Sequence, residues 1–199
     1  MSATDAVAAN PSGCEVSAPS QALPELAADD FTLFDLPRRF AQTAGDIDTR
    51  WKDLLRQAHP DRFAAADDAA RRASMMLATQ INAAYQTLRS PLKRASYLLE
   101  QAGIDIGAES NTAMSPEFLM SQMMWREQVA DARGEKNLAE LERLQVEIAD
   151  DIRDAYGDLA NALDRDHRAQ DAVEGVRRLM FLEKLREEIE DAIFALEDL

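Results

Sequence analysis

The amino-acid sequence predicts an all-α protein built from two groups of helices. Apolar residues recur at helical spacing from residue 30 almost to the end of the 199-residue chain. Hardly any segment shows the alternating apolar and polar pattern of a half-buried strand. Glycine and turn-forming residues interrupt the helical pattern over residues 103–113. We therefore expect one helical unit before this stretch and a second unit after it.

The first unit is expected to contain four helices, of which the second and third form a hairpin. The expected ranges are 30–36, ended by Pro37; 46–58; 67–88; and a last helix from Pro91 to near Gly103. One apolar stripe marks each long helix: Ile47, Trp51, Leu54, Leu55 and Ala58 on the second, and Leu77, Ile81, Ala84, Tyr85 and Leu88 on the third. Pro60 cannot continue the second helix, because its ring clashes with the preceding turn and it lacks an N–H. Ser90 before Pro91 is typical of an N-cap and first helical position.

The second unit is expected to be an antiparallel three-helix bundle. Ser115 and Pro116 again indicate an N-cap and first position, and that helix runs to Arg133 with Gly134 as its stop. Two long amphipathic helices follow, at about 137–165 and 169–198, with short connections. The expected organisation is a disordered tail (1–28), a first domain (29–101), a linker (102–114) and the bundle (115–199).

Charge and composition exclude several classes of function. The net charge of −15 divides into −3 for residues 1–28, +1 for 29–101 and −13 for 102–199. So acidic a second half should repel nucleic acid and anionic membranes. No apolar run approaches the roughly 18 residues that a membrane-spanning helix needs, and the N-terminus lacks the features of a secretory signal, so a cytoplasmic protein is expected. With Cys14 as the single cysteine and two histidines, we expect no metal site and no cofactor, and no phosphate-binding loop or nucleophile–base pair predicts an enzyme.

The sequence His59-Pro60-Asp61 lies between the two helices of the predicted hairpin. Pro60 stiffens the turn by fixing φ, and Asp61 offers an anion that can meet an arginine on a partner. Lys52 and Arg56 point away from the apolar stripe of the preceding helix, where they can attract an acidic partner over a distance. The alternative is a solvated loop in which the histidine has no function.

Residues 30–101 resemble a J-domain, with its signature at His59, Pro60 and Asp61. The similarity is to HscB-type co-chaperones in particular, on FTLFDLPRRF (31–40), QAHPDRF (57–63), INAAYQTLRSPLKRASYLL (81–99), SPEFLMSQMMWRE (115–127) and RRLMFLEKL (177–185). Arg62 stands where many members have lysine, which keeps the charge. The eukaryotic members carry a cysteine-rich zinc module that Cys14 alone cannot supply, so the resemblance is to the bacterial form.

The resemblance implies an L-shaped co-chaperone with two partners. Its J-domain would dock on a DnaK-type (HscA-like) ATPase and stimulate ATP hydrolysis, through His59, Pro60, Asp61, Arg50, Lys52, Arg56 and Arg62. Its bundle would hold the scaffold protein of iron–sulfur cluster assembly (IscU-like), through Leu119, Met120, Met123, Arg126, Glu127 and Phe181. Met123 stands where leucine is common, a near-isosteric change.

The helix at 115–133 shows two apolar faces without reference to any family. At about 100° per residue, Trp125, Val129 and Ala132 point within about 40° of Phe118, and these four residues should face the bundle. Leu119, Met120, Met123 and Met124 fall on the opposite side. A methionine-rich second face is typical of an adaptable protein-binding surface. The alternative is that this face packs on the first domain or on the other bundle helices.

Three other functions remain open from the sequence. A general protein-folding J-protein is disfavoured because the chain has no Gly/Phe-rich segment and no repeated CxxC region. A hydrolase using His59 and Asp61 as an acid–base pair is disfavoured because an exposed corner offers no pocket and no third group. A helical assembly module with an incidental His-Pro-Asp sequence would be insensitive to substitution of Asp61.

Overall fold

A computed structural model describes residues 29–63, 67–107 and 115–197, and every element in these ranges is helical. The elements are α1 (Asp30–Leu33), α2 (Ala44–Gln57), the 3-10 turn η1 (Pro60–Phe63), α3 (Asp68–Arg89), α4 (Pro91–Gln101), α5 (Pro116–Gly134), α6 (Leu138–Asp164) and α7 (Ala169–Glu197). The expected N-terminal tail and the second part of the expected linker lie outside the described residues.

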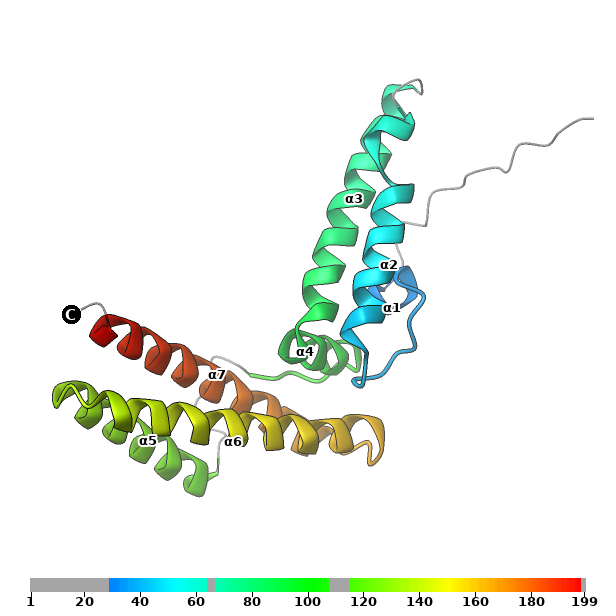
Figure 1. The fold of residues 1–199 in the computed structure, drawn as a ribbon. Coiled ribbons are helices and arrows are strands. Elements are labelled where there is room, and N and C mark those ends of the chain that lie inside the picture. The colour runs from blue at the N-terminus through cyan, green and yellow to red at the C-terminus, as the bar shows by residue number, and fades with distance from the viewer. Residues whose placement is uncertain (1–28, 64–66, 108–114, 198–199) are drawn as a thin grey trace, which may run out of the picture.

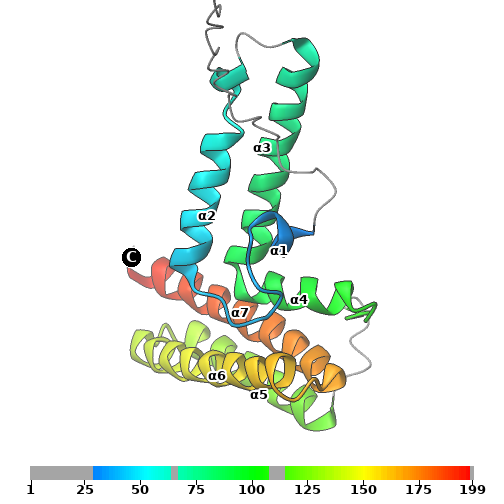
Figure 2. The same ribbon diagram turned by 90° about the vertical axis from the view of Figure 1, so that its right-hand side faces the viewer.

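The helices form two limbs that meet at a wide angle (Figure 1). The antiparallel hairpin of α2 and α3 forms one limb, and α5, α6 and α7 lie side by side in the other. Helix α4 crosses the base of the hairpin next to α7 (Figure 2). The predicted all-α, L-shaped fold with a helical hairpin and a three-helix bundle is confirmed.

Two of the predicted helix starts have the expected capping geometry. The Ser90 hydroxyl accepts a hydrogen bond from the Lys93 N–H at 3.4 Å, and the Ser115 hydroxyl accepts one from the Phe118 N–H at 3.3 Å. In each case a proline follows directly as the first helical residue. Since the first N–H groups of a helix have no partner inside it, a serine oxygen and a proline ring suit these positions.

Two predicted helix ends were wrong. The first helix stops at Leu33 and does not reach residue 36, because Asp35 takes a left-handed conformation (φ 50°) and the Leu36 N–H turns back to the Phe31 carbonyl. Gly134 was expected just beyond the end of its helix but is the last helical residue, and the left-handed position falls on Lys136 (φ 53°). In both places a residue other than glycine adopts the conformation that normally favours glycine.

Each limb has its own apolar core. In the hairpin limb, the buried residues are Phe31, Leu33, Phe34, Ile47, Ala58, Leu77, Ile81, Ala84 and Leu88. The core of the bundle runs along α6 and α7 from Leu141 to Ala192 and extends into the first limb, where it includes Phe40, Ala95 and Leu99. Ile106, in the expected linker, is also buried, and its carbonyl accepts a 2.6 Å hydrogen bond from Arg177 Nε. The described part of the linker is therefore packed against the bundle.

The loop between α1 and α2 joins the two limbs through Asp164 at the end of α6. The two carboxylate oxygens of Asp164 accept hydrogen bonds from the Phe40 and Ala41 N–H groups, both at 2.7 Å. The Phe40 ring stacks on Tyr156 of α6, with 6.5 Å between ring centroids. Backbone bonds and ring packing thus fix this loop to the bundle.

Arg94 on α4 completes the joint from the side of the first limb. It is buried, donates from Nε to the Phe40 carbonyl at 2.8 Å, and places its guanidinium 5.2 Å from the centroid of the Phe40 ring. It also donates to the Leu88 carbonyl. Burial lowers the pKa of Arg94, and the nearby charge of Asp164 acts in the opposite direction. A buried cation and an anion from different limbs therefore stabilise the same loop.

Candidate partner-docking surfaces

The His59-Pro60-Asp61 segment lies at the free tip of the α2–α3 hairpin, and a buried hydrogen bond fixes its base. Ala58 caps the C-terminus of α2 and is fully buried against the core. Its carbonyl accepts a 2.7 Å hydrogen bond from the hydroxyl of Ser74 on α3. A helix C-terminus leaves its last carbonyls without intrahelical partners, so Ser74 satisfies one of them and holds the start of the segment against α3. Ser74 is not among the functional residues predicted from the sequence, although a serine in line with the buried stripe of α3 was a usable signal.

The side chains of His59 and Asp61 are turned outward. The Asp61 N–H donates to His59 Nδ1 at 3.2 Å, and the Asp61 carboxylate lies 3.7 Å from the same nitrogen. The two side chains are 57% and 90% exposed. Water therefore surrounds both groups, which suits contact with a partner and not acid–base catalysis in a shielded site.

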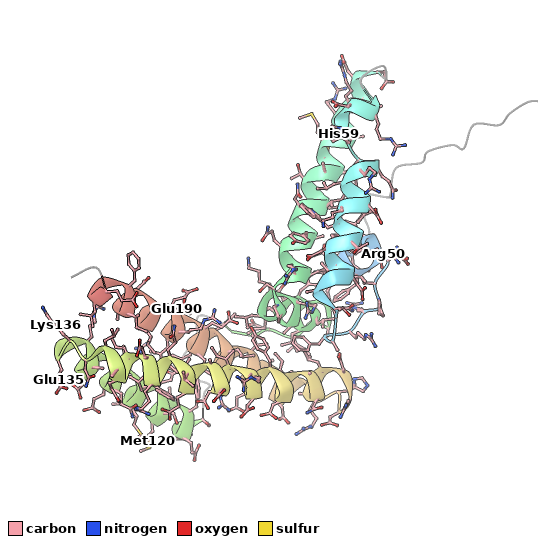
Figure 3. The ribbon with its side chains drawn as sticks, in the orientation of Figure 1. Arg50, His59, Met120, Glu135, Lys136 and Glu190 are labelled. Atoms are coloured by element: carbon pink, nitrogen blue, oxygen red, sulfur yellow. The ribbon has the colours of Figure 1, made fainter. Side chains whose placement is uncertain are left out.

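The basic residues assigned to this limb do not all share one face. Lys52 and Arg56 are exposed on α2, and the Arg56 guanidinium pairs with Asp53 at 2.8 Å. Arg62 in η1 donates to the Arg56 carbonyl at 3.5 Å. Arg50 instead pairs with Asp35 of the preceding loop at 2.8 Å and lies lower on the hairpin than His59, as Figure 3 shows. Arg56 and Arg62 therefore lie near His59 at the tip, and Lys52 points to the same face of α2 as Arg56, whereas Arg50 points to another face, towards Asp35.

Replacing Ser74 by Ala should lower the free energy of unfolding by about 1–3 kcal/mol, because the buried Ala58 carbonyl loses its partner. Thr79 provides the matched control, since its hydroxyl is exposed and bonds only to the Met75 carbonyl of its own helix. Thr79→Ala should change stability by less than about 0.5 kcal/mol. Urea denaturation midpoints at equal slope measure both effects. Equal losses for the two variants would contradict a special role for the Ser74 bond.

The second surface is the outer face of α5 in the bundle. Val129 and Ala132 are buried and Trp125 packs against the bundle core, as predicted for the inner face. On the other side Met120, Met123 and Met124 are 66%, 72% and 58% exposed, and Leu119 is half-buried. The two-faced reading of this helix is confirmed for its methionines, which do not pack on the protein's own core.

Phe181 of α7 is partly buried against the core of the bundle and also contacts α5. Its ring meets Phe118 edge-to-face, with 5.7 Å between centroids, and the guanidinium of Arg126 lies 5.6 Å from its centroid. The structure therefore brings Phe181 and Arg126 together, 55 positions apart in the sequence. Phe118, which was expected to serve the bundle core, instead supports Phe181 from the side. Glu127 is exposed on the same helix.

The N-terminal half of α5 lies over an open cleft of about 800 Å³ between α5, α6 and α7. Phe118 and Trp125 line the cleft from α5, and Leu159 and Leu182 line it from α6 and α7. Since the buried residues of α5 are Val129 and Ala132, this helix is held mainly by its C-terminal half.

Within residues 29–63, 67–107 and 115–197, no three His, Cys, Asp or Glu side chains are placed to hold a metal ion. In the same ranges no helix combines the length and the apolar composition needed to cross a bilayer.

Comparison with known proteins gives consistent matches along most of the chain. Residues 114–190 match the family model described as the HSCB C-terminal oligomerisation domain. The "Co-chaperone protein HscB homolog" of Azoarcus sp. (strain BH72) is 48% identical over 174 residues, which cover 87% of this chain and 98% of that protein. The protein of the same name from Paraburkholderia xenovorans (strain LB400) is 51% identical over 168 residues, covering 84% and 95%.

Two solved structures are similar over nearly the same extent. The chaperone HscB from Vibrio cholerae superimposes with a TM-score of 0.74 at 32% identity, covering 85% of this chain and 99% of that one. The human co-chaperone protein HscB gives a TM-score of 0.78 at 26% identity, covering 84% and 83%. Both the hairpin limb and the bundle therefore have counterparts in solved structures.

Proposed function

The chain belongs to the HscB family of co-chaperones, and from this premise we propose that it stimulates the ATPase of a DnaK-type (HscA-like) chaperone. In the same proposal it delivers to that chaperone the scaffold protein of iron–sulfur cluster assembly (IscU-like), in the cytoplasm. The observation that carries the proposal is the placement of two exposed surfaces on different limbs, His59 and Asp61 at the hairpin tip and the methionines of α5 on the bundle.

The ATPase docks on the hairpin limb through His59, Pro60, Asp61, Arg50, Lys52, Arg56 and Arg62. Asp61 offers a carboxylate that is 90% exposed and free to accept charge-assisted hydrogen bonds from an arginine of the partner. Lys52 and Arg56 attract an acidic surface during encounter. Arg50 is the weakest member of this set, since its guanidinium already pairs with Asp35.

The scaffold protein docks on the bundle through Leu119, Met120, Met123, Arg126, Glu127 and Phe181. The methionines supply flexible apolar contacts, and Phe181 supplies an aromatic ring held in place by Phe118 and Arg126. Such a mixture of aromatic, methionine and arginine side chains is typical of the centre of a protein interface. The protein performs no chemistry itself in this account and acts only on its partners.

The direct test combines the purified chain with the ATPase and the scaffold protein and measures ATP turnover. Turnover should rise when the chain is added to the ATPase and rise further when the scaffold is also present. An unfolded protein in place of the scaffold is the control, because a general folding J-protein would respond to it equally. An ATP turnover that does not change when the chain is added would refute the proposed function.

Replacing both Lys52 and Arg56 by Ala should slow association with the ATPase on the order of tenfold at low ionic strength. Raising the salt concentration should have the same effect on the unmodified chain, because exposed charges are screened beyond about 8 Å in physiological salt. The control replaces Arg153 and Lys184 of the bundle by Ala, which removes the same two charges from the other limb. Association rates are measured by stopped flow. Equal slowing by the two double variants would contradict a local role for the α2 charges.

A further inference from the structure

Two adjacent methionines on α3, Met75 and Met76, are exposed to the same extent, 62% and 61%. Single exposed apolar side chains are common on protein surfaces and indicate nothing by themselves. Their positions around the helix differ, however, because neighbouring residues of an α-helix point about 100° apart. The two methionines therefore belong to different faces of the hairpin.

Contacts between α2 and α3 show which flank of α3 adjoins α2. Trp51 Nε1 donates to Asn82 Oδ1 at 3.0 Å, and the Trp51 ring stacks on Tyr85 with 4.6 Å between centroids. Met75 precedes Asn82 by two helical turns and points within about 20° of it. Met75 therefore lies on the flank next to α2, whereas Met76 lies about 100° further round, on the side away from α2.

Lys52 and His59, two of the residues proposed to meet the ATPase, can be placed relative to Met75. The Ser74 hydroxyl donates to the Ala58 carbonyl. Met75 follows Ser74 and His59 follows Ala58, so Met75 and His59 lie at about the same height along the hairpin. Lys52 is exposed and lies one turn after Asp48, which accepts a hydrogen bond from the Tyr85 hydroxyl of α3, so Lys52 points to the same flank of the hairpin as Met75. Met75 thus adds an exposed apolar group at the level of His59 and about two helical turns from Lys52, in the one part of the chain whose net charge is not strongly acidic.

We propose that Met75 is an apolar anchor in the contact with the DnaK-type ATPase, a proposal that rests on the function proposed above. The partner surface would combine carboxylates, which meet Lys52, with a small apolar hollow that accepts the thioether. Methionine suits such a contact, because its unbranched side chain adapts to irregular hollows. Met76 takes no part.

The test compares Met75→Gln with Met76→Gln, a matched pair of the same chemistry, exposure and helix. Glutamine keeps the length and a good helix propensity, so neither variant should disturb the fold. The concentration of the chain that gives half-maximal ATPase stimulation should rise about tenfold for Met75→Gln, as expected for an interface side chain worth more than 1 kcal/mol. It should change less than about twofold for Met76→Gln. Met75→Leu should restore the original value, and the effect should persist at high salt, unlike that of the α2 charges.

Asp61→Asn, measured alongside, separates the two proposals. If Asp61→Asn stimulates like the unmodified chain, the ATPase partner itself is wrong. If Asp61→Asn is inactive while both glutamine variants behave alike, only the assignment of Met75 is wrong. Sedimentation of the same variants tests whether Met75 instead contacts a second copy of this chain. If Met75→Gln weakens self-association and leaves ATPase stimulation unchanged, Met75 serves contacts between copies, and the proposal is overturned.

Discussion

Replacing Asp61 by Asn is expected to abolish stimulation of the DnaK-type ATPase while leaving the fold intact. The side chain is 90% exposed, so the substitution removes a charge from water and opens no cavity. The Asp61 backbone N–H keeps its bond to His59 Nδ1, so the local turn should persist. A hydrogen bond between charged groups at an interface contributes about 1.5–3 kcal/mol, and an unpaired arginine left on the partner adds to the loss.

Partner ATP turnover, circular dichroism and thermal melting should be measured together for this variant. Asp154→Asn is the matched control, because it removes one exposed aspartate charge from α6 in the other limb. The control should stimulate normally, and the free energy of unfolding of both variants should stay within about 0.5 kcal/mol of that of the unmodified chain. Unchanged stimulation by Asp61→Asn would end the J-domain assignment and favour a helical assembly module.

Replacing Leu119, Met120, Met123 and Phe181 together by Ala should abolish binding of the scaffold protein but keep basal stimulation of the ATPase. Interface anchors commonly contribute about 2 kcal/mol each. Even two such losses would weaken a complex about a thousandfold, since each 1.4 kcal/mol is a factor of ten. The two methionines are exposed and their truncation should be harmless to the fold, whereas Phe181 packs on Phe118 and Arg126 and its loss should lower stability.

Calorimetric titration with the scaffold protein measures this effect, and melting of each variant is followed in parallel. The control truncates Val146, Met180 and Phe194, which are also exposed apolar residues of the bundle but lie outside the proposed site. A further variant that keeps Phe181 separates binding from stability. Normal affinity of the quadruple variant would refute the assigned face. Lost affinity together with a collapsed melting transition would mean that these side chains serve the protein's own core.

Features encoded by neighbouring residues could be predicted from the sequence. The starts of α4 and α5 follow from Ser90-Pro91 and Ser115-Pro116, because capping depends on side chains within one turn. The opposed faces of α5 follow from helical periodicity alone. The ends of α1 and α5 were predicted less well, because Asp35 and Lys136 adopt left-handed conformations that the sequence does not signal.

Contacts between distant segments could not be predicted in this way. Phe40 lies in a loop and Asp164 at a helix end, 124 positions apart, and neither belongs to a periodic pattern. Arg94 would be taken for a surface residue, yet it is buried because two carbonyls and an aromatic ring accept its guanidinium. The edge-to-face contact of Phe118 with Phe181 likewise depends on how α5 and α7 approach each other. Periodicity gives the direction of a side chain, and only the packing of helices gives its neighbour.

The joint at Asp164 has a consequence for how two partners would assemble on this chain. Two flexibly linked domains must lose rotational freedom when both partners bind, and their effective concentration falls as a linker lengthens. Here the hydrogen bonds of Phe40 and Ala41 to Asp164, with Arg94 behind them, order the two limbs when the protein folds. That rotational freedom is lost when the protein folds, before any partner binds, so the limbs would hold the two proposed docking surfaces in one preset orientation. Loosening the joint by Asp164→Ala would therefore weaken the ternary assembly more than either binary contact.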